Sequence, residues 1–259
     1  MAGQILAIGK FPPLLTTAAG FLTAFFISAA AIILNDYFDY EVDLVNAPER
    51  PLPSGLISKR EALWLTAITS LLGLASALYF GLLVLGLAIL LWVIGVLYNW
   101  RYKQSGLPGN LMVCLSVAST FLLGGISAGD FWNGIIWVFA GMAFFIDLGE
   151  EIAGDAMDME GDRKRGSRSI ALMKGRRFAI TISVICWAIV ILLSLIPFVL
   201  GWFGWSYLVF IGITDVLVVF FSIRLLQSKT PGEGRKAMRG VYIGATLAVV
   251  AFMLGQLIK

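Results

Sequence analysis

The stretch that decides the fold is Asn35-Asp36-Tyr37-Phe38-Asp39-Tyr40-Glu41-Val42-Asp43, which follows directly on a long apolar run. Four of its nine residues are acidic. On a helix, Asp36, Asp39 and Asp43 stand at positions i, i+3 and i+7 and therefore share one face. Asn35 lies one turn before Asp39 and is a neighbour on that surface. The pattern predicts an acidic stripe at the end of an apolar helix.

The same spacing returns in the second half of the chain as Asp155, Asp158 and Asp162, and Glu151 extends this second stripe by one turn. A lone acidic residue at a helix end would simply be solvated. Clustered carboxylates repel one another unless a cation or another partner compensates them, so two stripes of one spacing argue against simple solvation. In each half an apolar helix leads into an acidic stripe and then into a basic loop, which predicts two pseudo-repeat halves.

The composition is that of a membrane protein. Of 259 residues, 59% are hydrophobic and 14% are charged, whereas about 25% are charged in a soluble domain. We expect an all-α, polytopic transmembrane helical bundle that forms a single domain over residues 1–259. Eight apolar runs are long enough to cross a bilayer, and their expected ranges are 12–35, 61–80, 82–100, 108–128, 132–153, 177–200, 203–226 and 237–258.

Basic residues gather in alternate connections. Most of the 19 Lys and Arg lie in or beside the polar segments 36–60, 101–107, 154–176 and 227–236. By the positive-inside rule this side is cytoplasmic, which predicts a multi-pass protein of the cell membrane with both acidic stripes on its cytoplasmic side. The net charge of +3 is small, and no nucleic-acid-binding motif is present, so we expect no nucleic-acid partner.

The residues available for chemistry are restricted. The chain has no histidine, and its two cysteines, Cys114 and Cys186, lie inside apolar runs. This excludes zinc sites of the usual kind, Ser-His-Asp triads and Cys-His nucleophiles. Carboxylate and amide oxygens suit Mg²⁺, which commonly binds one or two carboxylates together with substrate phosphates. Two acidic stripes facing each other would hold two or more Mg²⁺ ions with a diphosphate between them.

Basic residues follow each stripe. Arg50 precedes Pro51-Leu52-Pro53-Ser54-Gly55, several Lys and Arg follow Asp162, and Tyr98-Asn99-Trp100-Arg101-Tyr102-Lys103 forms a third polar cluster. Two interpretations stay open: these residues contact phosphate, for which Arg is well shaped, or they only set the topology and the interfacial aromatic belt. The substrate-binding candidates are Arg50, Tyr98, Arg101, Lys103, Arg163 and Lys164. Together the features predict a substrate with a diphosphate head and an apolar tail.

The sequence at this point resembles the UbiA superfamily of intramembrane prenyltransferases. Asn35-Asp36-x-x-Asp39-x-x-x-Asp43 is similar to the first Asp-rich motif of that family, and Asp155-x-x-Asp158-x-x-x-Asp162 to the second. The resemblance implies Mg²⁺ as cofactor and a catalytic role for Asp36, Asp39, Asp158 and Asp162. The implied metal and diphosphate ligands are Asn35, Asp36, Asp39, Asp43, Asp158 and Asp162, with Asp155 added by its spacing.

Within the family, residues 151–163 and the segment Gly166–Gly175 are most similar to archaeal enzymes of ether-lipid synthesis. Those enzymes join geranylgeranyl diphosphate to geranylgeranylglyceryl phosphate and release diphosphate. The resemblance therefore implies an isoprenoid diphosphate, a glycerol phosphate lipid acceptor and membrane lipids as partners; it leaves the oligomeric state open.

Two departures from the family pattern stand out. The family fold has nine transmembrane helices against the eight expected here, which suggests that the first helix is the one lacking. Many members also carry Tyr-x-x-x-Lys in the third cluster. Here Tyr98 is followed at that spacing by Tyr102, with Lys103 one residue later, which on a regular α-helix turns the ammonium by about 100°.

Other functions remain as alternatives. The acceptor could be an aromatic quinone precursor or haem, since the acceptor is chosen by the shape of the pocket. A divalent-cation or lipid transporter is the rival of another class, but it requires acidic residues through the whole depth of the bundle. Asp147 and Asp215 lie inside apolar runs and would line a cavity or pair with polar neighbours. The general base is not identified.

Overall fold

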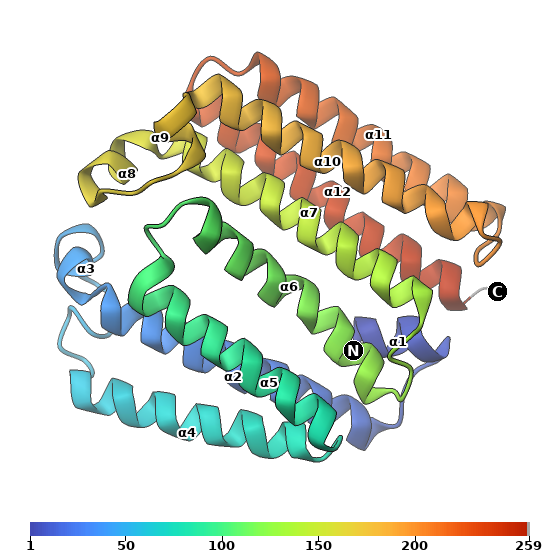
Figure 1. The fold of residues 1–259 in the computed structure, drawn as a ribbon, viewed down its shortest axis with the longest axis horizontal. Helices are drawn as coiled ribbons and strands as arrows, with labels where there is room; N and C mark the ends of the chain where they lie inside the picture. The colour runs from blue at the N-terminus through green and yellow to red at the C-terminus, as the bar shows by residue number, and fades with distance from the viewer. Residues whose placement is uncertain (258–259) are drawn as a thin grey trace. The chain divides into compact units, whose positions relative to one another are not determined.

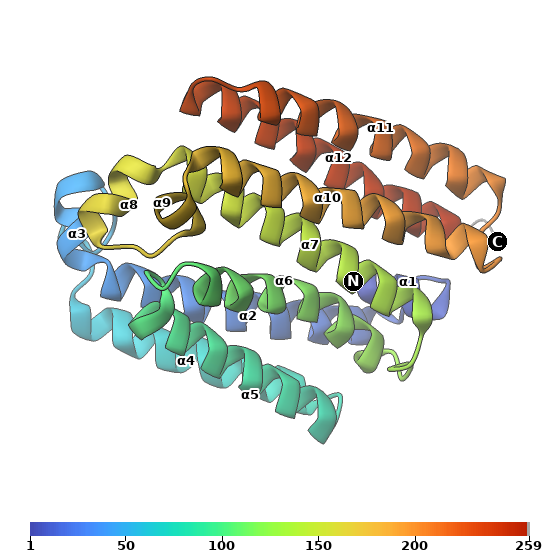
Figure 2. The ribbon, with the colours of Figure 1, turned by 45° about the horizontal axis from the view of Figure 1, so that its top comes forward.

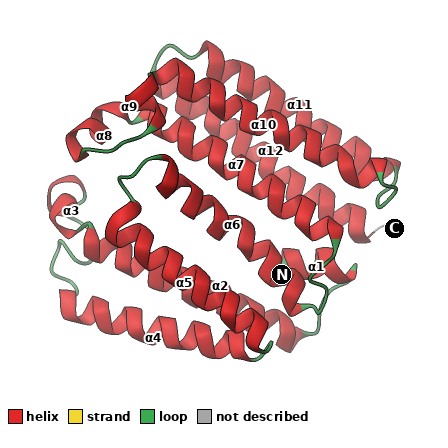
Figure 3. Cartoon of the chain, in the orientation of Figure 1, coloured by secondary structure: helices red, strands yellow, loops and turns green. Residues whose placement is uncertain are grey.

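The computed structural model describes residues 1–257, and within this range every element is a helix (Figures 1 and 3). The prediction of an all-α fold is confirmed. The last residue of the expected span 237–258 lies outside the described residues, as does Lys259. The elements are α1 (Ala2–Ile8), α2 (Leu14–Phe38), α3 (Tyr40–Asn46), α4 (Lys59–Leu78), α5 (Leu82–Leu97), η1 (Tyr98–Tyr102), α6 (Leu107–Ser127), α7 (Gly134–Met157), α8 (Met159–Arg165), α9 (Ile170–Lys174), α10 (Arg176–Val199), α11 (Trp205–Gln227) and α12 (Pro231–Leu257).

The helices form two compact units. The small unit is residues 13–103, which hold α2 to η1, and the large unit is residues 2–12 together with the chain from residue 104 onward. Each unit contains one of the two acidic motifs. A single transmembrane domain over residues 1–259 stays a prediction.

Seven of the described helices are long and apolar enough to cross a membrane: α2, α4, α5 with η1, α6, α10, α11 and α12. The eighth expected span corresponds to α7, whose 24 residues are sufficient in length. That helix carries Asp147, Glu150, Glu151 and Asp155, and the count of eight spans stays a prediction at this helix. The short α1 is apolar, and its Ile5 and Leu6 are fully buried.

In the large unit, α7 packs along α10, and α11 and α12 form an antiparallel hairpin (Figure 2). Trp187 on α10 donates its indole N–H to the carbonyl oxygen of Ile146 at 3.1 Å. Gly149 makes room for this ring, since a Cβ there would lie 2.4 Å from the indole nitrogen. Without a hydrophobic force between helices inside lipid, close packing of this kind is what holds a membrane bundle together. The acidic end of α7 is therefore held firmly on α10.

In the small unit, α2 lies against α4 and α5 (Figure 2). Gly73 of α4 allows a close approach to Ile27, whose side chain would be 3.0 Å from a Cβ at that position. Trp92 of α5 donates to the hydroxyl of Ser70 on α4 at 2.7 Å. These contacts hold α2, which carries the first acidic motif at its end.

The last helix begins earlier than expected. The polar segment 227–236 was predicted to be a loop, but α12 starts at Pro231 and leaves only residues 228–230 as a link. Proline favours the first position of a helix because its fixed φ suits the turn and its missing N–H has no partner there. Glu233 accepts the backbone N–H of Lys229 at 2.8 Å, which stabilises this start. The prediction was wrong because a polar segment was expected to be a loop, whereas these polar residues are helical.

We expect Gly124→Ala to destabilise the large unit. In the contact between α1 and α6, a Cβ at Gly124 would lie 2.8 Å from the Cα of Gly3, a backbone atom that cannot rotate away. Overpacking of this kind costs about 1–3 kcal/mol, so the midpoint of thermal unfolding in detergent should fall. Gly86→Ala in α5 is the matched control, because a Cβ there meets nothing within 4 Å and alanine favours the helix. An equal midpoint for the two variants would contradict the close packing of α1 on α6.

Candidate functional site

The first acidic motif spans a break between two helices. α2 ends at Phe38, α3 begins at Tyr40, and Asp39 joins them with φ −84° and ψ 1°. The backbone hydrogen bonds continue across the joint, since the N–H of Asp39 reaches the oxygen of Asn35 at 2.9 Å and the N–H of Asp43 reaches that of Asp39 at 2.8 Å. The expectation of one uninterrupted helical face is therefore corrected to a bent one. Asp39 sits in the sparsely populated bridge region, which active-site residues often occupy.

Arg50 closes over this motif. Its Nη1 donates to Asp43 at 2.8 Å and to Asp36 at 3.3 Å. The side chain of Asp43 is 9% exposed, whereas that of Arg50 is 44% exposed, so the pair lies at the edge of water. The hydrogen bond that Arg50 donates to Asp43, together with the negative charge of that carboxylate, raises the pKa of Arg50. Asp36 and Asp43 thus lie on a common face, as their spacing predicts, and Arg50 contacts both of them.

Lys103 reaches the same motif through an unusual helical turn. Residues Tyr98–Tyr102 form a π-helix, and the N–H of Lys103 donates to the oxygen of Tyr98, five residues earlier, at 2.9 Å. A π turn takes up one extra residue, and such turns occur often at functional sites. It therefore offsets the one-residue shift from Tyr-x-x-x-Lys, and the ammonium of Lys103 forms an ion pair with Asp39.

A pair of amides lies beneath this ion pair. Asn99, which is buried, donates to the backbone oxygens of Ala31 at 3.1 Å and Gly95 at 3.0 Å, and its own oxygen accepts from Asn35 at 2.9 Å. In the opposite orientation the Asn35 amide no longer donates to Asn99, and its oxygen accepts from Lys103 at 2.8 Å while its nitrogen donates to Asp39 at 3.2 Å. That orientation suits the ammonium, which can only donate. Asn99 belongs to the third polar cluster of the sequence but was not among the predicted site residues.

The second motif repeats the break. α7 ends at Met157, α8 begins at Met159, and Asp158 joins them with φ −113° and ψ 15°. The N–H of Asp162 donates to the oxygen of Asp158 at 3.0 Å, as Asp43 does to Asp39 in the first motif. Asp158 forms an ion pair with Arg235 from α12. The central aspartate of each motif therefore lies at a helix break and carries one basic partner from a later helical segment.

Asp155 is held by a residue that the sequence did not single out. Asn110 of α6 donates its amide to the carboxylate of Asp155 at 3.0 Å, and Asn110 is buried. Arg235 was also missed, because nothing in its position near the start of α12 distinguishes it from the other basic residues of that segment. The signal for Asn110 is an amide in the first turn of an apolar helix.

A polar pocket of about 370 Å³ opens beside the second motif. Asp162 is among its lining residues, and one of its carboxylate oxygens, Oδ2, is buried and has no hydrogen-bond partner. Burial raises the pKa of Asp162, as does the charge of Asp158, while Arg165 and Ser169 oppose the shift. An unpartnered buried carboxylate oxygen is costly, and a bound cation would compensate it. The pocket is lined by Glu150, Glu151, Gly154, Asp155, Asp158, Gly161, Asp162, Arg165 and Met238.

The other predicted substrate-binding residues do not line the polar pocket. Arg101 and Arg163 are exposed, and Lys164 pairs with Glu160 at 3.8 Å on the outside of α8. Arg165, which was not among the candidates, lines the polar pocket instead. Tyr98 is partly buried at the start of the π turn.

No group of three or more His, Cys, Asp or Glu side chains within residues 1–257 is arranged as a ready metal site. The carboxylates of Asp39, Asp43 and Asp158 instead pair with Lys and Arg. Their chemistry still fits Mg²⁺, which prefers carboxylate and amide oxygens and accepts incomplete protein coordination when a substrate phosphate completes it. The unpartnered oxygen of Asp162 fits the same ion.

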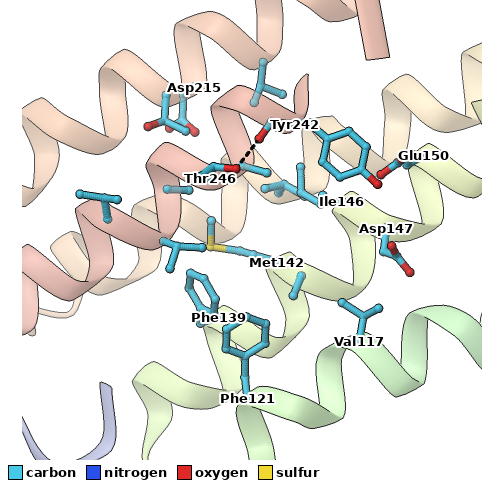
Figure 4. A pocket seen from close by; sticks show the side chains of 18 residues that line it. Val117, Phe121, Phe139, Met142, Ile146, Asp147, Glu150, Asp215, Tyr242 and Thr246 are labelled. Carbon is cyan, nitrogen blue, oxygen red and sulfur yellow. Dashed lines mark hydrogen bonds between the residues drawn. The ribbon is translucent and has the colours of Figure 1, made fainter. Parts of the chain in front are cut away.

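An apolar cavity of about 350 Å³ lies deeper in the large unit, and Figure 4 shows Phe121, Phe139 and Met142 on its wall. Glu150 lines both this cavity and the polar pocket, so the two adjoin. Asp147 and Asp215 also line the cavity, as expected, and Asp215 accepts the hydroxyl of Ser194 at 2.8 Å. No Lys or Arg is among the lining residues. The cavity thus accommodates hydrocarbon and offers nothing to balance a phosphate.

Comparisons with known proteins agree over nearly the whole chain. A family model described as the UbiA prenyltransferase family matches residues 1–255. The digeranylgeranylglyceryl phosphate synthase of Thermococcus kodakarensis is 31% identical over 257 residues, which cover 99% of this chain and 91% of the relative.

Solved structures match as well. One described as "Structural and mechanistic insights into the biosynthesis of Digeranylgeranylglyceryl phosphate synthase in membranes" has a TM-score of 0.88 at 29% identity, over 100% of this chain and 91% of that one. The UbiA homolog from Archaeoglobus fulgidus bound to GPP and Mg²⁺ has a TM-score of 0.69 at 18% identity, over 100% of this chain and 94% of that one. At 18% identity, this match shows only that the two proteins share a fold.

Proposed function

Because this chain belongs to the UbiA prenyltransferase family and is a multi-pass membrane prenyltransferase, we propose that it transfers a geranylgeranyl group from geranylgeranyl diphosphate to geranylgeranylglyceryl phosphate. Diphosphate is released, and the product carries the second ether link of an archaeal lipid. The name of the Thermococcus kodakarensis relative supports this acceptor, since it is similar over 99% of the chain.

One observation carries the proposal: the central aspartate of each motif stands at a helix break and has a basic side chain against it. The pairs are Asp39 with Lys103 and Asp158 with Arg235. A diphosphate needs both kinds of partner, a metal held by carboxylates and cations that contact its oxygens directly. Each motif therefore has an acidic and a basic group of the kinds that a diphosphate requires.

Mg²⁺ is the cofactor that these residues fit. Its proposed ligands come from Asn35, Asp36, Asp39 and Asp43 in the first motif, and from Asp155, Asp158 and Asp162 in the second. When bound, Mg²⁺ acts as a Lewis acid that offsets the charge growing on the leaving diphosphate. The Archaeoglobus fulgidus homolog bound Mg²⁺ together with GPP, which supports the same choice here.

The side chains of this chain do the remaining work. Arg50 and Lys103 in the small unit, and Arg165 in the large unit, are the basic residues proposed to donate to diphosphate oxygens. The apolar cavity takes the isoprenoid and excludes water from the allylic carbon after its bond to oxygen breaks. The acceptor hydroxyl then forms the new bond to that carbon and gives its proton to a carboxylate, a diphosphate oxygen or water. The basic loops support a cytoplasmic location for this chemistry by the positive-inside rule.

The direct test is prenyl transfer by the purified protein in detergent with Mg²⁺ and labelled geranylgeranyl diphosphate. Geranylgeranylglyceryl phosphate, a hydroxybenzoate, a naphthoate and haem are supplied separately as acceptors. We expect labelled ether lipid with the first acceptor and none with the others. Transfer to an aromatic acceptor alone would reassign the substrate. Metal flux into proteoliposomes without any prenyl transfer would favour a transporter.

Filling the apolar cavity should change the preferred donor. Ala143→Phe adds a ring to a wall lined also by Phe139 and Met142, so a long chain loses room before a short one does. We expect turnover of geranylgeranyl diphosphate to fall roughly tenfold, with geranyl diphosphate nearly unaffected. Leu192→Phe, on an exposed position of α10, is the control that adds bulk outside the cavity. An equal loss with both donors would mean that the cavity does not hold the chain.

A further inference from the structure

A third hollow lies in the hairpin of α11 and α12, and none of its lining residues belongs to an acidic motif. α11 ends at Gln227, α12 begins at Pro231, and the two helices run side by side from this link (Figures 1 and 2). The hollow measures about 320 Å³. Its lining residues all belong to the last two turns of α11, the link and the first two turns of α12, namely Phe220, Phe221, Arg224, Gln227, Ser228, Glu233, Lys236 and Ala237.

The walls of this hollow are of two kinds. Phe220, Phe221 and Ala237 make an apolar part, while Arg224 and Lys236 bring positive charge. Phe221 lies against Gly240, where a Cβ would be 2.3 Å from the ring, so the small residue lets the ring lie flat on α12. A ligand that filled this space would need an anionic group next to hydrocarbon.

Neither cation is balanced by an acid of the protein. Within the part of the chain that the structure describes, no ion pair involves Arg224 or Lys236, and both are exposed. The guanidinium of Arg224 lies over the ring of Phe220, 5.6 Å from its centre. Glu233 is the acid in the lining, and its carboxylate already accepts the N–H of Lys229 at 2.8 Å. Two cations therefore face a single acid that is engaged at the start of α12.

The position of the hollow relative to the membrane determines which anions are available to it. Arg224 lies in the last turn of a 23-residue helix that is apolar enough to cross a membrane, which places it at the level of the lipid headgroups. Basic pockets between transmembrane helices at this level bind lipid phosphates. A guanidinium can hold a phosphate through two parallel hydrogen bonds, and an ammonium adds a third contact.

We propose that this hollow binds the phosphate head of an anionic membrane lipid, with Arg224 and Lys236 on the phosphate and the lipid chains along Phe220 and Phe221. The site goes beyond prenyl transfer, because none of its residues belongs to either motif or to the apolar cavity. The same phosphate chemistry could come from free inorganic phosphate. That ion lacks chains for the aromatic wall, so the lipid should bind more tightly.

The test uses the full-length protein, stripped of lipid in a neutral detergent, and native mass spectrometry to count bound ligand. Phosphatidylglycerol, phosphatidylcholine and inorganic phosphate are titrated separately. We expect saturable binding of phosphatidylglycerol. Each of Arg224→Gln and Lys236→Gln should weaken it about fivefold, and the double variant roughly 25-fold, because one basic residue near a headgroup contributes about 1 kcal/mol.

The matched control is the double variant Lys229→Gln with Arg239→Gln, which removes two charges from the same segment at exposed positions outside the hollow. We expect less than a twofold change. An equal loss in the two double variants would overturn the site, because binding would then depend only on general surface charge. Inorganic phosphate binding as tightly as the lipid would overturn the lipid assignment. If the first double variant does not fold, the two single variants decide the question.

Discussion

Replacing Asp39 or Asp158 by alanine is expected to lower the rate of diphosphate release roughly a thousandfold. Each carboxylate is the central one of its motif, lies at a helix break and holds a basic partner. Its loss removes an electrostatic contact that acts on the charge of the leaving group, and losses of that kind cost about 10²–10³ in rate, with a metal ligand lost as well. The measurement is release of diphosphate from geranylgeranyl diphosphate by purified protein with Mg²⁺.

Each control variant also removes one carboxylate, but at a position outside the proposed site. Glu41→Ala and Glu160→Ala remove exposed acids that lie within the two motif segments, where they pair only loosely with Lys59 at 3.6 Å and Lys164 at 3.8 Å. Both should keep activity within about twofold, as weak surface pairs contribute little. Size-exclusion profiles and thermal midpoints show whether the aspartate variants remain folded. Retained turnover in both folded aspartate variants would reject the assignment of the motifs.

Lys103→Gln should lower the same rate roughly a hundredfold. The ammonium pairs with Asp39 and, with the Asn35 amide turned over, donates to its oxygen at 2.8 Å. Glutamine preserves much of the length but supplies no charge for the diphosphate, and charge-assisted hydrogen bonds are about twice as strong as neutral ones. Arg60→Gln, which removes an exposed charge at the start of α4, is the control and should be nearly silent.

A deletion tests the π turn itself. Removing Trp100, an exposed residue in the middle of the turn, brings Lys103 to the four-residue spacing from Tyr98 that a regular α-helix needs. The lysine then still reaches Asp39, so this variant should retain more than a tenth of the activity, well above Lys103→Gln. A deletion variant as inactive as Lys103→Gln would show that the π turn does more than restore the register.

The membrane fold follows from properties that a sequence displays directly. Apolar runs of about 20 residues must be helices, because the bilayer offers no partner for free backbone groups. The expected ranges agree with the observed helices within a few residues, apart from the start of α12 at Pro231. The polar residues at this position are helical because of the proline and a capping glutamate. In the sequence-based prediction, these local signals were outweighed by the polar composition of the segment.

The acidic motifs were also predictable, but their partners were not. Asp39 and Asp158 have the spacing that marks them, whereas Arg235 stands among other basic residues and Asn110 is a single amide on another helix. Which of many basic residues meets a given carboxylate depends on how helices cross, and that is set by packing along their whole length. Arg165 rather than Arg163 or Lys164 lines the polar pocket for the same reason.

By itself the sequence determined that this is an all-helical membrane protein with two acidic motifs, because hydrophobicity and helical periodicity act locally along the chain, and the resemblance of those motifs to a known family implied a prenyltransferase. Only the tertiary structure decided that each motif bends at its central aspartate, that a π turn carries Lys103 to Asp39, and that an apolar cavity adjoins the polar pocket through Glu150. The reason is physical: backbone bends and side-chain partners minimise the energy of contacts between helices, and those contacts join residues far apart in the chain.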